Sequence, residues 1–208
     1  MPARDRQLVA LSADLERLRA RLGAATALVV NPNPSRWASK ALGVALDDWQ
    51  AEIMEADSHR ICVIASRQSG KSTITAARAA YTAAANPGHR IVLVSPTFRQ
   101  SNALRSKVLG CLQRAEVGHD QTREEIRLHN GSTIRALPGD DPDKVRGATA
   151  DLVIIDEAAF VKTSVTSAVL PMLASTGGDL IAVSTPNGPL GLFHELATSA
   201  DVLCIRVP

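Results

Sequence analysis

The chain has 208 residues, of which 45% are hydrophobic and 21% charged, proportions typical of one compact globular domain. No segment approaches the roughly 18 uncharged apolar residues that a membrane span needs, and the charged start MPARDRQ is unlike a signal peptide, so we expect a cytosolic protein with no membrane partner. Three cysteines without C-x-x-C spacing argue against a disulfide framework and a zinc site. We expect Cys62, Cys111 and Cys204 to be small core residues.

The formal net charge is only +2, although it is unevenly distributed. The first 40 residues carry seven Lys/Arg and three Asp/Glu, whereas the remainder carries 16 and 18. This asymmetry is too weak to indicate a nucleic-acid surface by itself. Because aromatic residues make up 3% of the chain, few side chains could stack on nucleic-acid bases. Any DNA binding would therefore have to depend mainly on phosphate contacts.

Residues 1–30 are predicted to form an amphipathic helix or arm. Leucines recur at spacings of three and four residues from Leu8 to Leu22, with Arg and Glu between them, which gives a helix a narrow apolar seam. The sequence leaves open whether this seam packs on the chain's own domain or docks on a partner. The prolines of Asn31-Pro32-Asn33-Pro34 disfavour helix in the residues before them, which predicts a linker over 31–45.

Residues 46–208 alternate short β-branched runs with alanine-rich helical stretches, which predicts one α/β domain. The expected strands are ICVIA (61–65), IVLVS (91–95), DLVIID (151–156), LIAVS (180–184) and VLCIRV (202–207). Continuous apolar strands separated by helices favour a mainly parallel sheet covered by helices on both faces. Within this pattern, Asn130-Gly131 joins two alternating segments and predicts a β-hairpin.

The segment ASRQSGKST, residues 65–73, lies between an expected strand and the helical stretch ITAARAAYTAAA. A strand, a tight loop and a helix N-terminus place backbone N–H groups and the positive end of the helix dipole around one point, which suits a polyphosphate. We expect Gly70 to allow close approach, Lys71 to reach the β and γ phosphates, and Ser72 to ligate Mg²⁺. The usual phosphate-binding loop (P-loop) pattern begins with glycine where this chain has Ala65, so the motif by itself is imperfect.

The segment DLVIIDEAA, residues 151–159, is an expected buried strand that ends in two adjacent carboxylates. We expect Asp156 to hold the Mg²⁺ shell and Glu157 to orient and deprotonate the attacking water. A helix N-cap is the structural alternative for such a pair. The upstream P-loop favours the chemical role, because strands that flank one switch point bring their carboxyl ends together.

Two shorter segments accompany these motifs. Ser184-Thr185-Pro186 follows an expected strand, and small hydroxyls at a strand end can hydrogen-bond toward the γ-phosphate and register its loss. Trp49-Gln50 precedes the P-loop strand, and a glutamine amide can both donate to and accept from the edge of adenine. The structural alternatives are an ordinary turn after a strand and a polar residue on a helix.

In this order, the preceding WQ, the P-loop SRQSGKST, DLVIIDEAA and STP resemble the ATPase domain of the large terminase subunit, the DNA-packaging motor of tailed bacteriophages. A P-loop with an early Arg-Gln and no first glycine is itself a feature of that family. The resemblance implies a RecA-like P-loop ATPase fold of the additional-strand type, with ATP and Mg²⁺ as cofactors. It also implies a homo-oligomeric ring that pushes double-stranded DNA into a procapsid, with the portal protein and the small terminase subunit as partners, in the host cell cytoplasm.

The resemblance also implies roles for individual residues. The nucleotide-binding set is Gln50, Ser66, Arg67, Gln68, Ser69, Gly70, Lys71, Ser72 and Thr73, the metal set is Ser72 and Asp156, the catalytic carboxylate is Glu157, and the coupling set is Ser184, Thr185 and Pro186. Arg146, in an expected loop just upstream of the acidic strand, resembles the family's arginine finger, which reaches the ATP of a neighbouring subunit. Arg67, inside the P-loop, is the alternative finger.

The C-terminal nuclease of that family is not expected in this chain. After Glu157 the acidic residues are Asp179, Glu195 and Asp201, too few and too close to the ATPase strands for a nuclease metal cluster, so the chain is read as an excised domain or a truncated gene product without DNA cleavage. Two other functions remain open. One is a helicase-like, nucleic-acid-stimulated motor, which would need a second RecA-like domain; the other is a non-hydrolysing ATP-binding module in which Glu157 is only a helix cap.

Overall fold

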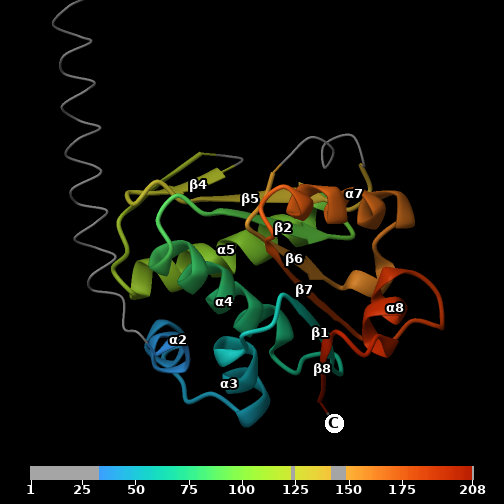
Figure 1. Cartoon of the computed structure of the whole chain (residues 1–208). Coiled ribbons are helices and arrows are strands. Elements are labelled where there is room, and N and C mark those ends of the chain that lie inside the picture. Colours follow the sequence, from blue (N-terminus) through green and yellow to red (C-terminus); the bar gives the residue numbers. More distant parts are fainter. Residues whose placement is uncertain (1–32, 123–124, 142–148, 208) are drawn as a thin grey trace, which may run out of the picture.

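The computed structural model describes residues 33–122, 125–141 and 149–207, which form one eight-stranded sheet with helices on both faces (Figure 1). The predicted α/β fold with a mainly parallel sheet is therefore confirmed. The predicted N-terminal helix or arm (1–30) and Arg146 lie outside the described residues. Within the described ranges, none of the helices has the length and apolar character needed to cross a membrane.

The sheet combines six parallel strands with an antiparallel extension at one edge. Its strands are β1 (Arg60–Ile64), β2 (Arg90–Ser95), β3 (His119–Gln121), β4 (Glu125–Leu128), β5 (Thr133–Pro138), β6 (Leu152–Asp156), β7 (Asp179–Ser184) and β8 (Leu203–Arg206). Their order is β3-β4-β5-β2-β6-β7-β1-β8, and only the β3–β4 and β4–β5 pairs are antiparallel among the described strands. Because β7 lies between β1 and β6, one strand separates the P-loop strand from the acidic strand, as the additional-strand fold requires.

Helices cover the sheet in two layers. They are α2 (Pro34–Leu42), α3 (Asp48–Glu55), α4 (Lys71–Ala85), α5 (Phe98–Arg114), the 3₁₀ turn η1 (Ala158–Phe160), α7 (Thr163–Ala174) and α8 (Leu192–Thr198). The first four pack on one face and the last three on the other (Figure 1). Alternate strand residues therefore enter different cores: Ile61 and Val63 share a core with the alanines of α4, whereas Cys62 shares one with α8. Alanines line the buried side of α4, and these small side chains let it lie close to the sheet.

Residues 34–42 correct one prediction, because the linker expected over 31–45 contains helix α2. The Asn33 side chain accepts a hydrogen bond from the Arg36 N–H at 2.7 Å, and Pro34 occupies the start of the helix, where its missing N–H costs nothing. The buried ring of Trp37 packs edge-on against Tyr81 of α4, with ring centroids 5.6 Å apart. Pro34, which opposes helix in the residue before it, therefore starts one here.

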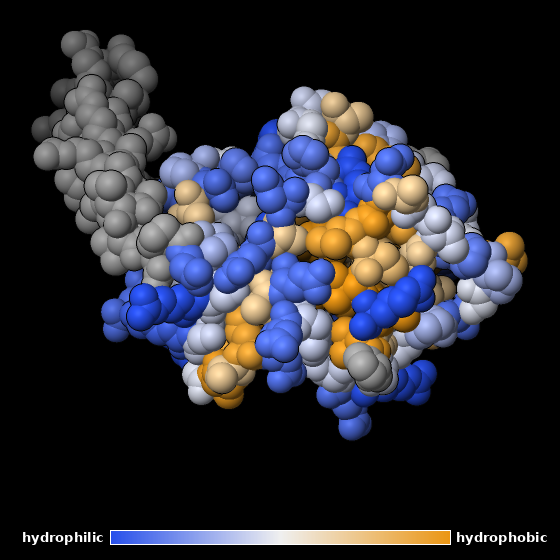
Figure 2. All heavy atoms as spheres, turned by 60° about the horizontal axis from the view of Figure 1, so that its bottom comes forward, coloured by the Kyte–Doolittle hydropathy of each residue, from blue (hydrophilic) through white to orange (hydrophobic). Residues whose placement is uncertain are grey.

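Among the other local predictions, the hairpin and two of the three core cysteines agree with the structure. Asn130-Gly131 joins β4 to β5 as the predicted hairpin, with Gly131 at φ +87°, in the left-handed region that glycine tolerates. Cys62 and Cys111 are buried, and Cys204 is half-buried on the edge strand β8. In Figure 2, where the lower side of Figure 1 comes forward, apolar atoms gather in a patch bordered by polar ones.

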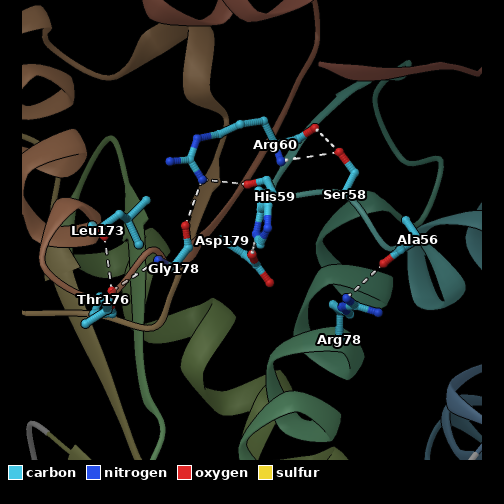
Figure 3. Close-up of polar contacts among 10 residues, drawn as sticks. Ala56, Ser58, His59, Arg60, Arg78, Leu173, Thr176, Gly178 and Asp179 are labelled. Carbon is cyan, nitrogen blue, oxygen red and sulfur yellow. Dashed lines mark hydrogen bonds and ion pairs between the residues drawn. The ribbon is translucent and has the colours of Figure 1, made fainter. Parts of the chain in front are cut away.

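Polar contacts fix the amino ends of β1 and β7, opposite the P-loop (Figure 3). The Arg60 guanidinium donates to the carbonyl of Gly178 at 2.7 Å and so ties the start of β1 to the start of β7. In the same view, Arg78 of α4 points toward the last turn of α3, where its guanidinium donates to the carbonyls of Met54 and, at 3.2 Å, Ala56. These bonds hold α3, which carries Gln50, against α4, which begins at the P-loop.

Candidate active site

A cavity of about 600 Å³ opens at the carboxyl ends of β1, β2 and β6. Its walls come from the loop and first turn that follow β1, from the segment and helix that follow β2, and from the residues that follow β6. The lining residues are Arg67, Gln68, Gly70, Lys71, Ser72, Thr73, Pro96, Gln100, Lys107, Glu157 and Phe160. A cavity of this size is in the range that holds a nucleotide-sized ligand.

The loop between β1 and α4 has the geometry of an anion cradle. Gly70 caps α4 at φ +90° and Gln68 lies at φ +63°, so the chain turns twice through the left-handed region before the helix begins. The backbone N–H groups of residues 66–72 donate to no backbone or side-chain acceptor in the described part of the chain. These donors, together with the N-terminus of α4, are therefore free to bind an anion.

Lys71 is the buried cation of this loop, with 5% of its side chain exposed. Its Nζ donates to the carbonyl of Ser66 at 3.3 Å and forms an ion pair with Glu157 Oε1 at 3.2 Å. The predicted phosphate-binding cation is thus held by the predicted catalytic carboxylate. A phosphate that enters the cavity would have to compete with Glu157 for Lys71.

Asp156 and Ser72 form the predicted metal pair, and the structure brings them together. The Ser72 hydroxyl donates to Asp156 Oδ2 at 2.8 Å. Burial raises the pKa of Asp156, and the hydrogen bond from Ser72 only partly opposes that rise. Asp156 Oδ1 is buried and has no hydrogen-bond partner among the described residues. A buried carboxylate with one oxygen unused, beside a hydroxyl, fits the oxygen ligands that Mg²⁺ prefers.

Glu157 has a strained backbone at this site, with φ +52° in a residue that is not glycine. Its Oε1 contacts Lys71, and its Oε2 accepts a hydrogen bond from the hydroxyl of Ser184 at 3.5 Å. The same hydroxyl accepts from the N–H of Ala159 at 3.2 Å. Ser184, buried at the end of β7, therefore connects the predicted coupling segment to the loop that carries the predicted catalytic carboxylate.

The other two residues of the coupling set lie further out. Thr185 is half-buried and Pro186 is exposed, and in the described chain only Ser184 of the three hydrogen-bonds to Glu157. In the P-loop, Ser66 and Ser69 contact each other, because the Ser69 hydroxyl donates to the Ser66 carbonyl at 2.9 Å. These two serines shape the loop without lining the cavity.

Gln50 lies against the P-loop rather than in the cavity wall. Its Oε1 accepts from the N–H of Asp47 at 3.1 Å, which caps the start of α3. Its Nε2 is 3.1 Å from the position that a Cβ on Gly70 would occupy. The structure thus places the predicted adenine-binding residue beside the P-loop, with its carbonyl oxygen engaged in a helix cap.

Sequence reasoning missed four residues of the cavity, namely Pro96, Gln100, Lys107 and Phe160. The first three follow β2, which neighbours β6 in the sheet, so the carboxyl end of β2 lies beside the acidic pair. The rule that parallel strands share one carboxyl edge would have pointed to the segment after IVLVS. Lys107 gave no such signal, because it lies inside α5, about two helical turns beyond Gln100.

Comparison with known proteins identifies relatives whose family is consistent with the geometry of this site. The family model "Terminase large subunit, T4likevirus-type, N-terminal" matches residues 62–200. The terminase large subunit of Thermus phage G20c is 30% identical over 184 residues, covering 78% of this chain, and so is that of Thermus virus P23-45. The chain spans 38% of the length of these curated relatives.

Solved structures show the same architecture. The large terminase ATPase domain of Thermus phage P74-26 superposes with a TM-score of 0.75 at 27% identity, over 85% of this chain and 86% of that one. The large terminase of another thermophilic bacteriophage, solved in complex with ATP-gamma-S, gives a TM-score of 0.60 at 16% identity, over 83% of this chain and 44% of that one. At such low identity the second likeness shows a common fold alone.

Proposed function

The chain belongs to the family of terminase large subunits, and on this premise we propose that it is the ATPase domain of such a subunit, which hydrolyses ATP with Mg²⁺ to move double-stranded DNA into a procapsid. The observation that carries the proposal is that Lys71, Ser72 and Glu157 line one cavity beside a loop of unpaired N–H groups, and that Ser72 donates a hydrogen bond to the buried Asp156 behind it. Two separate segments of the chain, the P-loop and the end of β6, supply what phosphoryl transfer to water requires: anion donors, a metal pair and a base.

Nucleotide binding begins with the P-loop. The N–H groups of residues 66–72 and the ammonium of Lys71 would donate hydrogen bonds to the polyphosphate oxygens. Arg67, Gln68 and Thr73 line the same wall of the cavity. Because Lys71 is paired with Glu157 before the nucleotide binds, phosphate binding exchanges one anionic partner of Lys71 for another. That exchange releases Glu157 in the presence of the substrate.

Ser72 and Asp156 would hold Mg²⁺, whose charge offsets the negative charge of the phosphate oxygens. The unpartnered Oδ1 of Asp156 and the adjacent Ser72 hydroxyl fit this ion, as described above. Burial of Asp156 limits competition by water, and the proton that burial favours would be displaced when the ion binds.

Glu157 is the proposed general base. Once released from Lys71, its carboxylate accepts a proton from the attacking water while the water oxygen bonds to the γ-phosphorus and the bond to the leaving ADP oxygen breaks. Ser184, which donates to Oε2, would orient the carboxylate during this step and register the departure of phosphate. Thr185 and Pro186 would pass that change to the chain beyond β7.

The remaining roles depend on family membership. Gln50 is proposed to contact adenine, and Arg146 to act as an arginine finger on the ATP of a neighbouring subunit in a homo-oligomeric ring, with Arg67 as the alternative. Double-stranded DNA, the portal protein of the procapsid and the small terminase subunit are the proposed partners, in the host cell cytoplasm. The relatives whose names support these partners are longer than this chain.

The test is phosphate release from ATP with Mg²⁺, measured without DNA, with double-stranded DNA and procapsids, and with single-stranded DNA. Stimulation by double-stranded DNA and procapsids supports the packaging motor, whereas a preference for single strands supports a helicase-like motor. The Lys71→Ala protein is the control, because loss of the cation that neutralises the phosphates should abolish release. Release equal in the wild type and in Lys71→Ala would reject the site, and no release from a wild type that binds ATP would support a non-hydrolysing module.

A further inference from the structure

Lys107 is a cation at the nucleotide cavity that belongs to no phosphate-binding motif. It lies on α5, well outside the P-loop, yet its side chain lines the cavity together with Lys71 and Thr73. Its Nζ donates to the hydroxyl of Thr73 at 3.5 Å, a long hydrogen bond to the P-loop helix. The Lys107 ammonium thus reaches the P-loop from a second helix.

Electrostatics at the cavity support a role for this ammonium. In the described structure Lys107 forms no ion pair, whereas the charge of Lys71 is matched by Glu157. The lining residues include three cations, Arg67, Lys71 and Lys107, and one carboxylate, and this excess of positive charge complements a polyphosphate.

We propose that Lys107 is a polyphosphate-binding residue, supplied by α5, that strengthens nucleotide binding without taking part in bond cleavage. The proposal rests on the proposed function of the same cavity. An exposed lysine is ordinarily only solvated, but here the flexible stem begins at the cavity wall and the ammonium already contacts the P-loop. A short movement of the side chain would exchange the weak Thr73 contact for a charge-assisted bond to phosphate.

Lys107 differs from Lys71 in what its loss should change. Lys71 is buried and paired with the base, so its removal disturbs both binding and chemistry. Lys107 is exposed and has no hydrogen bond to Glu157 among the described residues, so its removal should weaken nucleotide binding and leave the chemical step alone. The signature is therefore a raised dissociation constant and KM with little change in kcat.

The experiment is a calorimetric titration of the purified chain with ATP and with ADP, in EDTA to exclude the metal, using Lys107→Ala and Lys107→Arg. The matched control is Arg99→Ala, which removes one positive charge from an exposed position of the same helix outside the cavity. Lys107→Ala should raise the ATP dissociation constant about tenfold, by an amount that shrinks at high salt, and Lys107→Arg should restore most of the affinity. Steady-state kinetics with Mg²⁺ should show kcat within about twofold of the wild type.

Two results would overturn the proposal. One is an ATP affinity of Lys107→Ala equal to that of Arg99→Ala, which would show that Lys107 is a solvated side chain. The other is an unchanged affinity with a lowered kcat, which would assign Lys107 to the chemical step. The wild type and Lys71→Ala are titrated alongside: if the wild type does not bind ATP, the proposed function itself fails, independently of Lys107.

Discussion

The ion pair between Lys71 and Glu157 makes the Glu157→Gln variant the most informative single change. The substitution keeps the size of the side chain and leaves an amide oxygen that can still accept from Lys71, but it removes the charge and the base. If the pair competes with phosphate for Lys71, the variant should lose turnover and at the same time bind nucleotide more tightly. No purely structural role for Glu157 predicts both effects.

The distance between the Lys71 and Glu157 charges sets the size of the expected changes in stability and in ATP affinity. Unit charges 3.2 Å apart attract by about 5 kcal/mol at an effective dielectric constant of about 20. The Glu157 side chain is 26% exposed, and lost hydration offsets most of this attraction, leaving about 1–2 kcal/mol. The ligand-free variant should therefore melt about 2–8 °C lower than the wild type. Its affinity for ATP should rise about 5- to 30-fold, because the nucleotide no longer has to displace a carboxylate.

Three measurements test this reasoning: thermal unfolding without ligand, calorimetric titration with ATP, and phosphate release. Turnover should fall about 100-fold or more. Glu195→Gln is the control, because it removes an exposed carboxylate on α8 and should leave all three measurements nearly unchanged. Wild-type turnover in Glu157→Gln would exclude Glu157 as the base, and an unchanged ATP affinity would show that the ion pair does not oppose nucleotide binding.

Three further predictions concern the metal pair, the α3–α4 contact and the subunit interface. Because burial raises the pKa of Asp156, Mg²⁺-dependent nucleotide binding should weaken on mild acidification more than binding measured in EDTA, and Asp156→Asn should abolish that difference. The raised pKa also means that protonation favours the folded state, so this contribution to the stability of the ligand-free protein is lost as pH rises through the folded-state pKa. Arg78→Ala should lower the free energy of unfolding in urea by about 1–3 kcal/mol, because the carbonyls of Met54 in α3 and of Ala56 just after it lose their donor, whereas Arg36→Ala on the exposed face of α2 should change it little. Turnover should rise with protein concentration in the wild type but not in Arg146→Ala, and mixing Arg146→Ala with Lys71→Ala should restore part of the activity; absence of rescue in mixtures shown to co-assemble would argue against a finger in trans.

Local sequence signals predicted correctly those features whose geometry depends only on residues that are neighbours in the sequence. The apolar strand runs, the Asn130-Gly131 hairpin and the strand-loop-helix setting of the P-loop each depend on neighbouring residues, and all are present. The prediction of a linker was wrong over residues 34–42 because the proline signal was local but ambiguous. Proline ends a helix at one position and starts one at another, and here the capping by Asn33 decides between the two.

The sequence by itself determined the family, the fold class and most of the residues that line the cavity, because the P-loop and the acidic strand are continuous segments with distinctive spacing. The tertiary structure alone decided how these segments meet. Sheet order places β6 one strand away from β1, which brings Ser72 to within 2.8 Å of Asp156 across 84 positions of sequence. The pairing of Lys71 with Glu157 and the approach of Lys107 to Thr73 likewise result from how β6 and α5 pack on α4. Spacing along the chain cannot give such contacts, because they depend on the distances between elements after packing.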